Sequence, residues 1–342
     1  TNTRTISATN GAQVDLSHMT LLRGGSGSAG GLDKVQVVSA TGGTVDLSQL
    51  AQVDGTVEFV SDATSYTLGQ LQHAGAVTYD LPDGATLSLP ELLTQTGGGF
   101  DVSDGMTVGA GKLQSLRNAQ ISFAGSGSVT VPSLTDFSGS TLTLSDASQA
   151  VGTGGLTQID NARFLVSGGV TFSQIGDTDY VITSPTVANT TVLSADGAGT
   201  VLDGSFLQTI DSYVDHWGTN TRTISATNGA QVDLSHVTLL RGGSGSAGGL
   251  DSVRVAAATG GEIVLSDLTT VEGTVFFEAG AGGVLRFGNL AMTAAMDISA
   301  DGLNSRIAAA SLMLDPQANL SVTDAAGVRR HPAGHRRADD GD

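Results

Sequence analysis

A leucine returns at one constant interval through the first half of the chain, and this period constrains the fold more than any other feature. The strict run consists of Leu50, Leu71, Leu92, Leu113 and Leu134. The spacing continues less strictly at Leu156 and Ile175, and a slightly longer interval separates Leu268, Leu290 and Leu312. A period of about 21 residues that is kept in this way is the signature of repeat proteins, in which each unit packs mainly against its neighbours.

Each repeat follows the template V-x-L-x-x-L-x-x-V-x-G-x-V-x-F, which is clearest from Val45 to Phe59 and recurs from Ile263 to Phe277. Steps of two residues indicate short strands with one inward face. Steps of three indicate corners, where the backbone turns so that apolar side chains keep facing one axis. Glycines such as Gly55 suit bends where a side chain would clash. We therefore predict an all-β fold, a right-handed parallel β-helix (β-solenoid) with coils of ~21 residues.

Two other folds share part of this pattern. An antiparallel β-sandwich also has many short strands, but it would not keep the same residues at the same phase. The phase resembles that of leucine-rich repeats, whose helix-forming half and Asn ladder are absent here, so an all-β parallel helix fits better. About 14 to 15 coils at ~4.8 Å each predict a rod of roughly 65–70 Å. The pattern leaves open whether a coil has two walls or three.

A much longer repeat overlies the short one. The stretch TNTRTISATNGAQVDLSHMTLLRGGSGSAGGLD occupies residues 1–33 and returns at residues 219–251 with one change, Met19 to Val237. We interpret it as a recent duplication, by which such arrays lengthen. The Gly/Ser insert at 24–33 must leave the wall as a loop or widen one coil.

The pattern divides the chain into four parts. Residues 1–175 and 219–322 are predicted solenoid coils, residues 176–218 are irregular or extended coils, and residues 323–342 form a polar, flexible tail. Both ends of the solenoid are expected to expose open sheet edges, which in other solenoids are covered. We therefore expect the ends to meet other copies of the chain or neighbouring repeats of a longer one.

Architecture and composition together resemble giant bacterial secreted and surface β-solenoid proteins of the adhesin and filamentous-haemagglutinin type. The resemblance implies a structural, non-enzymatic protein, located outside the cell or on its surface, that forms a filament, a stalk or a spacer. The chain has no Cys, does not begin with Met and shows no signal peptide. We expect it to be a piece of something longer or a processed product.

The net charge and the hydrophobic pattern of the chain exclude two classes of binding partner. The net charge is −18, with 33 acidic against 15 basic residues. An acidic surface repels phosphate backbones, so we expect no nucleic-acid partner. No apolar run approaches the roughly 20 residues that span a bilayer, so we expect no membrane insertion.

Candidate site residues lie in the segment 176–218, where the period is interrupted. They are Tyr180, Tyr213, His216 and Trp217, and they would contact a polysaccharide if they shared one face. This gives an alternative function, a carbohydrate-binding or polysaccharide-degrading β-helix. Acids such as Asp101 and Asp104 are scattered and are interpreted as turn formers rather than a catalytic pair. No cofactor is expected, and Ca²⁺ is the ion that such acidic turns would favour.

Overall fold

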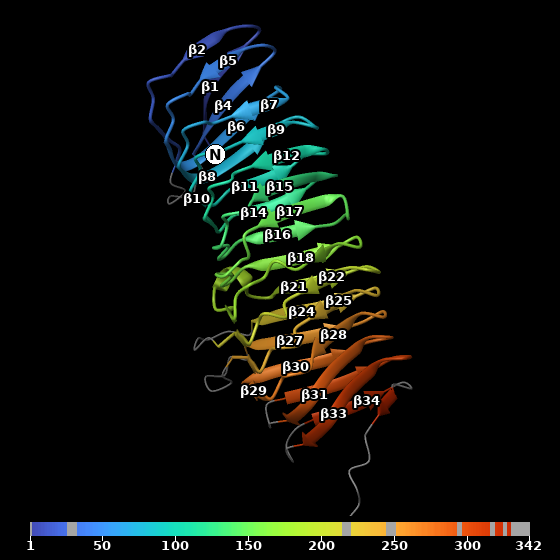
Figure 1. Ribbon diagram of the computed structural model, residues 1–342. Coiled ribbons are helices and arrows are strands. Elements are labelled where there is room, and N and C mark those ends of the chain that lie inside the picture. Colours follow the sequence, from blue (N-terminus) through green and yellow to red (C-terminus); the bar gives the residue numbers. More distant parts are fainter. Residues whose placement is uncertain are drawn as a thin grey trace, which may run out of the picture.

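The computed structural model describes residues 2–25, 33–213, 220–243, 251–292, 296–314, 319–323 and 327–329. These residues form one elongated stack of β-coils that begins with β1 and β2 and ends with β33 and β34 (Figure 1). Every pair of named strands within the described part of the chain is parallel. The architecture is therefore an all-β parallel β-helix, as predicted from the period.

The strands fall into three walls, because each complete coil contributes one strand to each. The coil β24–β25–β26, for example, pairs strand by strand with the next coil, β27–β28–β29. The first wall is the longest. Its strands are β1 (Thr3–Thr9), β4 (Lys34–Ala40), β6 (Gln52–Ser61), β8 (His73–Asp80), β11 (Gly99–Val102), β14 (Gln120–Phe123), β16 (Thr141–Leu144), β18 (Arg163–Ser167), β21 (Thr190–Asp196), β24 (Thr221–Thr227), β27 (Ser252–Ala257), β30 (Thr274–Ala279), β32 (Met296–Asp301) and β34 (Asn319–Thr323).

The other two walls use shorter strands. The second wall contains β2 (Gln13–Asp15), β5 (Thr44–Asp46), β7 (Ser65–Thr67), β9 (Thr86–Ser88), β12 (Met106–Gly109), β15 (Gly127–Val131), β17 (Gln149–Thr153), β19 (Thr171–Phe172), β22 (Val201–Asp203), β25 (Gln231–Asp233), β28 (Glu262–Leu265), β31 (Val284–Met292), β33 (Arg306–Leu314) and β35 (Gly327–Arg329). The third contains β3 (Leu21–Arg23), the starts of β6 and β8, β10 (Thr94–Thr96), β13 (Ser115–Arg117), β20 (Asp179–Val181), β23 (Thr209–Asp211), β26 (Leu239–Arg241) and β29 (Thr270–Glu272). A short 3-10 helix, η1 (Pro185–Val187), precedes β21.

Register places equivalent residues directly above one another. Thr94 pairs with Ser115, one leucine period further along the chain, whereas Ile224 pairs with Val255 across a longer step that contains the second Gly/Ser insert. The first wall has four strands in one sheet and ten in the next, joined by a bridge from Val77 to Gly98, which makes fourteen levels among the described residues. At ~4.8 Å per level, the stack rises about 62 Å.

The core is a set of apolar columns that run along the rod. The recurring leucines of the sequence form one column, fully or almost fully buried from Leu50 to Leu290, with Leu312 packed against its end. A second column runs along the inner face of the first wall through Val37, Phe59, Tyr79, Phe100, Ile121, Leu142, Phe164, Leu193, Ile224, Val255, Phe277 and Ile298. Within it, the rings of Phe59, Tyr79 and Phe100 stack, with centroids 5.8 and 6.0 Å apart.

The two copies of the long repeat fold alike. Residues 3–23 form β1, β2 and β3, and residues 221–241 form β24, β25 and β26 at the same positions within the repeat. In both copies the ends of the Gly/Ser insert are held together: Gly25 N–H donates to the Asp33 carbonyl at 2.9 Å, and Gly243 N–H donates to the Asp251 carbonyl at 3.0 Å. The two described ends of each insert therefore lie side by side, and residues 26–32 and 244–250 between them lie outside the described residues.

The solenoid continues through the segment that was predicted to consist of irregular or extended coils. Residues 179–213 keep their places in all three walls, as coils with a longer register step, for example from Leu193 to Ile224. Beyond residue 322, residues 327–329 form β35 and pair with β33. The remainder of the predicted tail, residues 330–342, lies outside the described residues.

Candidate functional site

The outer face of the third wall carries polar side chains that bond from coil to coil. Alternate residues of its short strands point inward, so the residues on either side of each buried one face outward. Because consecutive coils stack in register, these outward residues form a column along the rod. Two hollows lie on this column, and they are the candidate site.

The first hollow lies where β23, β26 and β29 end. It has a volume of about 250 Å³ and is lined by Tyr213, Arg241, Glu272 and Gly273. Arg241 bridges three successive coils, with Nη1 3.0 Å from Asp211 Oδ2 and Nε 2.7 Å from Glu272 Oε2. The hydrogen bond with Glu272 and the charge of Asp211 raise the pKa of Arg241 above its usual value. The Tyr213 ring centroid lies 6.0 Å from the guanidinium carbon.

This first hollow offers an exposed ring beside a cation and two carboxylates. Tyr213 is 42% exposed, which leaves ring surface for a ligand. An aromatic face with neighbouring hydrogen-bonding groups suits the stacking of a sugar ring. The charge of Arg241 is also neutralised by Asp211 and Glu272, which is consistent with a purely structural role in joining three coils.

The second hollow lies on the same wall, in coils nearer the N-terminus. It has a volume of about 280 Å³ and is lined by Arg117, Asn118, Ser138, Gly139, Asp160, Asn161 and Ser184. Its polar groups bond across coils: Asn161 Oδ1 accepts from Ser184 N–H at 2.6 Å, and Asp160 Oδ1 accepts from Val181 N–H at 3.0 Å. The side-chain oxygens of Asn161 and Asp160 in this hollow are therefore already used in hydrogen bonds between coils.

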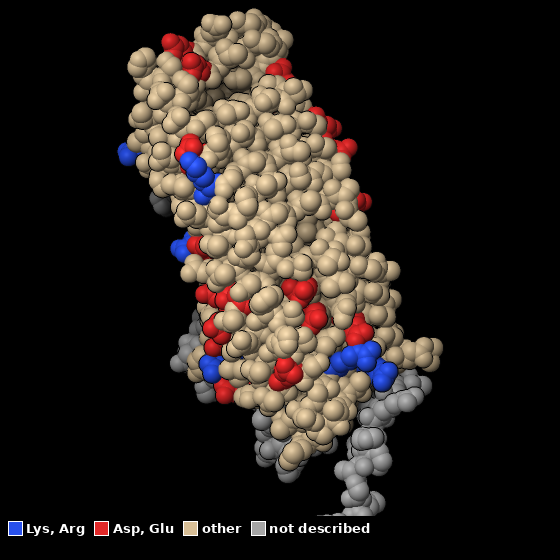
Figure 2. Space-filling model, viewed as in Figure 1, with Lys and Arg blue, Asp and Glu red and all other residues tan. Residues whose placement is uncertain are grey.

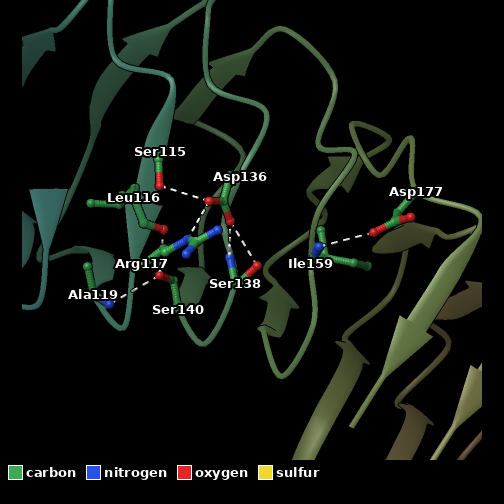
Figure 3. A network of polar contacts seen from close by, with 9 residues as sticks. All are labelled: Ser115, Leu116, Arg117, Ala119, Asp136, Ser138, Ser140, Ile159 and Asp177. Carbon is green, nitrogen blue, oxygen red and sulfur yellow. Dashed lines mark hydrogen bonds and ion pairs between the residues drawn. The ribbon is translucent and has the colours of Figure 1, made fainter. Parts of the chain in front are cut away.

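Asp136 organises the network beside the second hollow (Figure 3). Its Oδ2 accepts from Ser115 Oγ at 2.8 Å and from Arg117 Nε at 2.5 Å, while its Oδ1 accepts from Ser138 N–H and Oγ at 3.1 and 2.8 Å. Burial alone would raise the pKa of Asp136, but the hydrogen bonds from Ser138, Ser115 and Arg117 outweigh it and hold the pKa below its usual value. The carboxylate is thereby kept charged and fixed.

Asp177 shows the opposite balance two coils further along the rod (Figure 3). Its Oδ2 accepts from Ile159 N–H at 3.1 Å. Burial raises the pKa of Asp177, and the nearby charge of Asp160 adds to the effect, against the hydrogen bonds it accepts. Asp136 and Asp177 thus differ in protonation tendency, although both cap backbone or side-chain donors between coils.

A buried ion pair lies inside the solenoid rather than on its surface. Arg222 of β24 is 1% exposed and Asp251 is 2% exposed, with Nη1 and Oδ2 3.6 Å apart. Asp251 Oδ1 also accepts from Asn220 N–H at 2.9 Å. Arg222 Nε and Nη1 have no hydrogen-bond acceptor within the described part of the chain. The equivalent residue of the first copy, Arg4, is exposed.

Of the four residues predicted from the sequence, the structure describes Tyr180 and Tyr213, and these two do not share a face. Tyr180 is fully buried, and its hydroxyl donates to the Ala162 carbonyl, so it belongs to the apolar column of the third wall. Tyr213 lines the first hollow. His216 and Trp217 lie outside the described residues. The expectation of ligand contact is therefore carried by Tyr213, in company with Arg241 and Glu272, which sequence reasoning missed.

The acids Asp101 and Asp104 each bond to the next coil. Asp101 Oδ1 accepts from Gln120 Nε2 at 2.7 Å, and Asp104 Oδ1 accepts from Ser126 N–H at 2.8 Å. Asp104 also lies in a turn, so it combines the local role expected of it with a bond to the next coil. Within the described ranges, no three His, Asp or Glu side chains gather in a way that could hold a metal ion.

The surface carries ion pairs between basic and acidic side chains of neighbouring coils. On the face seen in Figure 2, basic groups lie beside acidic ones within a largely uncharged surface. Ion pairs such as Lys112 with Glu91, at 2.7 Å, join successive coils. No helix in the described residues has the length and apolar character needed to cross a membrane.

Comparison of the chain with models of known protein families, with curated protein sequences and with solved structures found no significant match.

Proposed function

We propose that this chain is a rigid structural segment of a secreted or cell-surface bacterial protein of the adhesin or filamentous-haemagglutinin kind. Its role is mechanical: it separates what lies at one end from what lies at the other, as a stalk, a spacer or a filament subunit. Stiffness comes from backbone hydrogen bonds and apolar columns that join each coil to the next.

One observation carries the proposal. The buried inner column of the first wall continues through twelve of the fourteen levels, from Val37 to Ile298, and its register is kept on both sides of β24 in the second copy of the long repeat. A chain that repeats one inner surface without interruption gains length with each added coil, and it gains little else. Length is therefore the property that the fold varies most readily.

The test is a change of length by whole coils. His73 pairs with Thr94 and Thr94 with Ser115, so residues 73–114 make up two register steps. A second copy of residues 73–114 inserted after Gln114 should lengthen the rod by ~10 Å without lowering its melting temperature. Negative-stain electron microscopy measures the length, and the same images show whether rods join into filaments.

A Gly/Ser insertion of the same length at the same place is the matched control, and it should leave the rod length unchanged. Equal rod lengths for both insertions, or a bent rod after the coil insertion, would contradict the spacer role.

The first hollow favours a second function, the binding of a polysaccharide. If this hollow binds sugars, Tyr213→Ala should abolish binding of the protein to an array of acidic and neutral glycans. Phe206→Ala is the control, because Phe206 is also an exposed aromatic, at 62%, but lies outside the hollow. Equal, undiminished retention of both variants would exclude the hollow as the binding site.

A further inference from the structure

Several buried polar atoms near the second Gly/Ser insert have no hydrogen-bond partner among the described residues. They are Nε and Nη1 of Arg222, Oδ2 of Asp251 and Oγ of Ser212. All three side chains are buried, so they are withdrawn from bulk solvent. A buried donor or acceptor without a partner is destabilising, and native proteins pair such groups with protein atoms or with ordered water. These atoms therefore mark a place inside the solenoid that can hold a small polar ligand.

Arg222 lies at the corner where the third wall passes into the first. It precedes Ile224 by two residues in β24, and both side chains face inward because the residues of a strand alternate. In the next two coils the register places Val253 and then Val275 at the same position, and both are fully buried. A charged side chain thus occupies a position that is apolar in the coils beyond it.

Asp251 reaches this corner from the next coil, at the residue before β27. Its Oδ1 accepts from Asn220 N–H at 2.9 Å, which fixes the carboxylate and leaves Oδ2 for Arg222. Oδ2 lies 3.6 Å from Arg222 Nη1. This separation allows an ion pair, but it is longer than the roughly 2.7–3.2 Å of an N–H···O hydrogen bond. A water within reach of both atoms could accept from the guanidinium and donate to the carboxylate.

Ser212 supplies a further unpaired group to the same corner from the preceding coil. It follows Ile210 by two residues, and both are fully buried, so its side chain also faces inward. Its N–H donates to the Arg241 carbonyl at 2.8 Å, and the N–H of Gly243, two residues further on, donates to the Asp251 carbonyl at 3.0 Å. These backbone bonds bring Ser212 to the side of the corner where the ion pair lies.

The charges at this corner decide what the site can hold. Arg222 and Asp251 neutralise each other, so an added anion or cation would bring an unpaired charge into the core. The unpaired atoms are donors on Arg222, an acceptor on Asp251 and a hydroxyl on Ser212, which can do either. A ligand must therefore be neutral and must both accept and donate. Water meets these conditions, and a buried water typically has about three polar partners.

We infer that Arg222, Asp251 and Ser212 form an internal binding site for ordered water, which joins three successive coils at the base of the second Gly/Ser insert. The water accepts from Arg222 and donates to Asp251 Oδ2, and Ser212 Oγ completes the hydrogen-bond network. The inference rests on the contacts at this corner and not on the proposed role of the rod.

The test combines a crystal structure with a measurement in solution, both on the full chain. Crystals that diffract well enough to show ordered water should reveal density within hydrogen-bond distance of both Arg222 and Asp251 Oδ2. In solution, with arginine labelled by ¹⁵N, the Arg222 Nε–H should show a nuclear Overhauser cross-peak to water, with the sign of a molecule that tumbles with the protein. Loss of the signal in Arg222→Lys assigns it.

Arg163 is the matched control for the solution measurement. Its Nε–H already donates to the Thr191 carbonyl at 2.9 Å, so it should show no such cross-peak. Ser212→Ala is the second control, and the Arg222 cross-peak should remain in this variant. Its disappearance would contradict the inference, because the Ser212 hydroxyl proton, and not water, would then be its source.

A neutral double variant tests whether the ion pair holds the water. Arg222→Met combined with Asp251→Asn removes the unpaired donors and both charges, and the new amide keeps an oxygen for the Asn220 N–H. Because no charge is left unpaired in the core, this variant should fold. Its crystals should lack the density, and density that persists would show that the ion pair does not hold it.

Two further results would overturn the inference. One is a direct hydrogen bond between Arg222 and Asp251, or protein acceptors for the arginine nitrogens, with no density beside them. The other is density in the crystal without a cross-peak in solution, which would identify a water ordered by the crystal only. Neither result bears on the length series that tests the spacer role, so failure of one proposal is separable from failure of the other.

Discussion

Ile6 and Ile224 occupy the same position in the two copies of the long repeat, but their side chains are buried to different extents. Both lie in the sequence TRTISAT, and both face the core. Ile224 is fully buried between Leu193 and Val255, its register partners in the coils on either side. Ile6 has a register partner on one side, Val37, and is only partly buried. Replacing each by alanine therefore removes the same atoms from different surroundings.

The expected costs follow from these surroundings. Ile→Ala removes three carbon atoms, worth ~2.4 kcal/mol of transfer free energy when they are fully buried. At Ile224 a cavity closed by both neighbouring coils adds to this, so the total cost should be ~3–4 kcal/mol. At Ile6 burial is partial and one side is open to water, so no closed cavity forms and the cost should be ~1 kcal/mol.

The assay must report on coils separately, because long repeat arrays need not unfold in one step. Native-state hydrogen exchange, measured at increasing urea concentrations, gives the free energy of opening separately for each copy of the repeat. Thr5→Ala and Thr223→Ala are the matched controls, since these side chains face outward in both copies. Equal costs at Ile6 and Ile224 would refute the reasoning, because burial by the covering coil would then contribute nothing.

Three further outcomes test other parts of the structure. Asp251→Asn leaves a buried arginine without its counter-charge and should cost ~3 kcal/mol or more in a urea titration, whereas Asp33→Asn, in the open copy, should cost less than ~1 kcal/mol. Gly98→Ala would place a Cβ 2.1 Å from a backbone carbonyl oxygen at φ +63° and should lower the melting temperature by several degrees, while Gly111→Ala, with open space around it, should not. Asp136 has a folded-state pKa below its unfolded value, so its stabilisation is present above that value and is lost as the pH falls through the folded pKa; Asp136→Asn should flatten the loss of stability measured between about pH 5 and pH 3.

Sequence reasoning reached the fold because the leucine period reports burial directly. Leu50, Leu71 and Leu92 are each 0% exposed, and each occupies the same corner of its coil. A side chain that must face the axis once per turn leaves a period that an antiparallel β-sandwich would not preserve at the same phase. The number of walls could not be predicted from the sequence, because a corner gives the same short spacing of apolar residues whatever the angle through which the backbone turns.

The burial of Tyr180 was missed although the sequence carries a signal for it. Ile210 and Leu240 follow it at equal intervals, and the three residues share one inward column. That interval is longer than the leucine period, so a search confined to the leucine period could not align this segment. The buried Arg222 left a signal too: it alternates with Ile224 and Ala226, both buried, so period-2 reasoning would have placed a charge inside the core.

The polar contacts could not be derived from the sequence, because they depend on which coil stacks on which. Arg241 reaches Asp211 on one side and Glu272 on the other only because the register pairs it with both of these residues. A step changed by one residue would turn each of these side chains to the opposite face of its wall. Composition predicts an acidic surface, and only register decides which acids meet a base.

Register also explains why whole coils are the natural unit of change in this chain. Each inner column consists of residues that are equivalent from coil to coil, so removing one complete coil brings together two that already fit each other. A partial coil would instead shift every strand beyond it and expose its apolar face. The repeat of residues 1–33 at 219–251 obeys this restriction, since both copies pair in the same register, Thr3 with Lys34 and Thr221 with Ser252. A duplication that begins and ends at equivalent points of the coil preserves both interfaces, and the fold therefore admits changes in length while it rejects changes in phase.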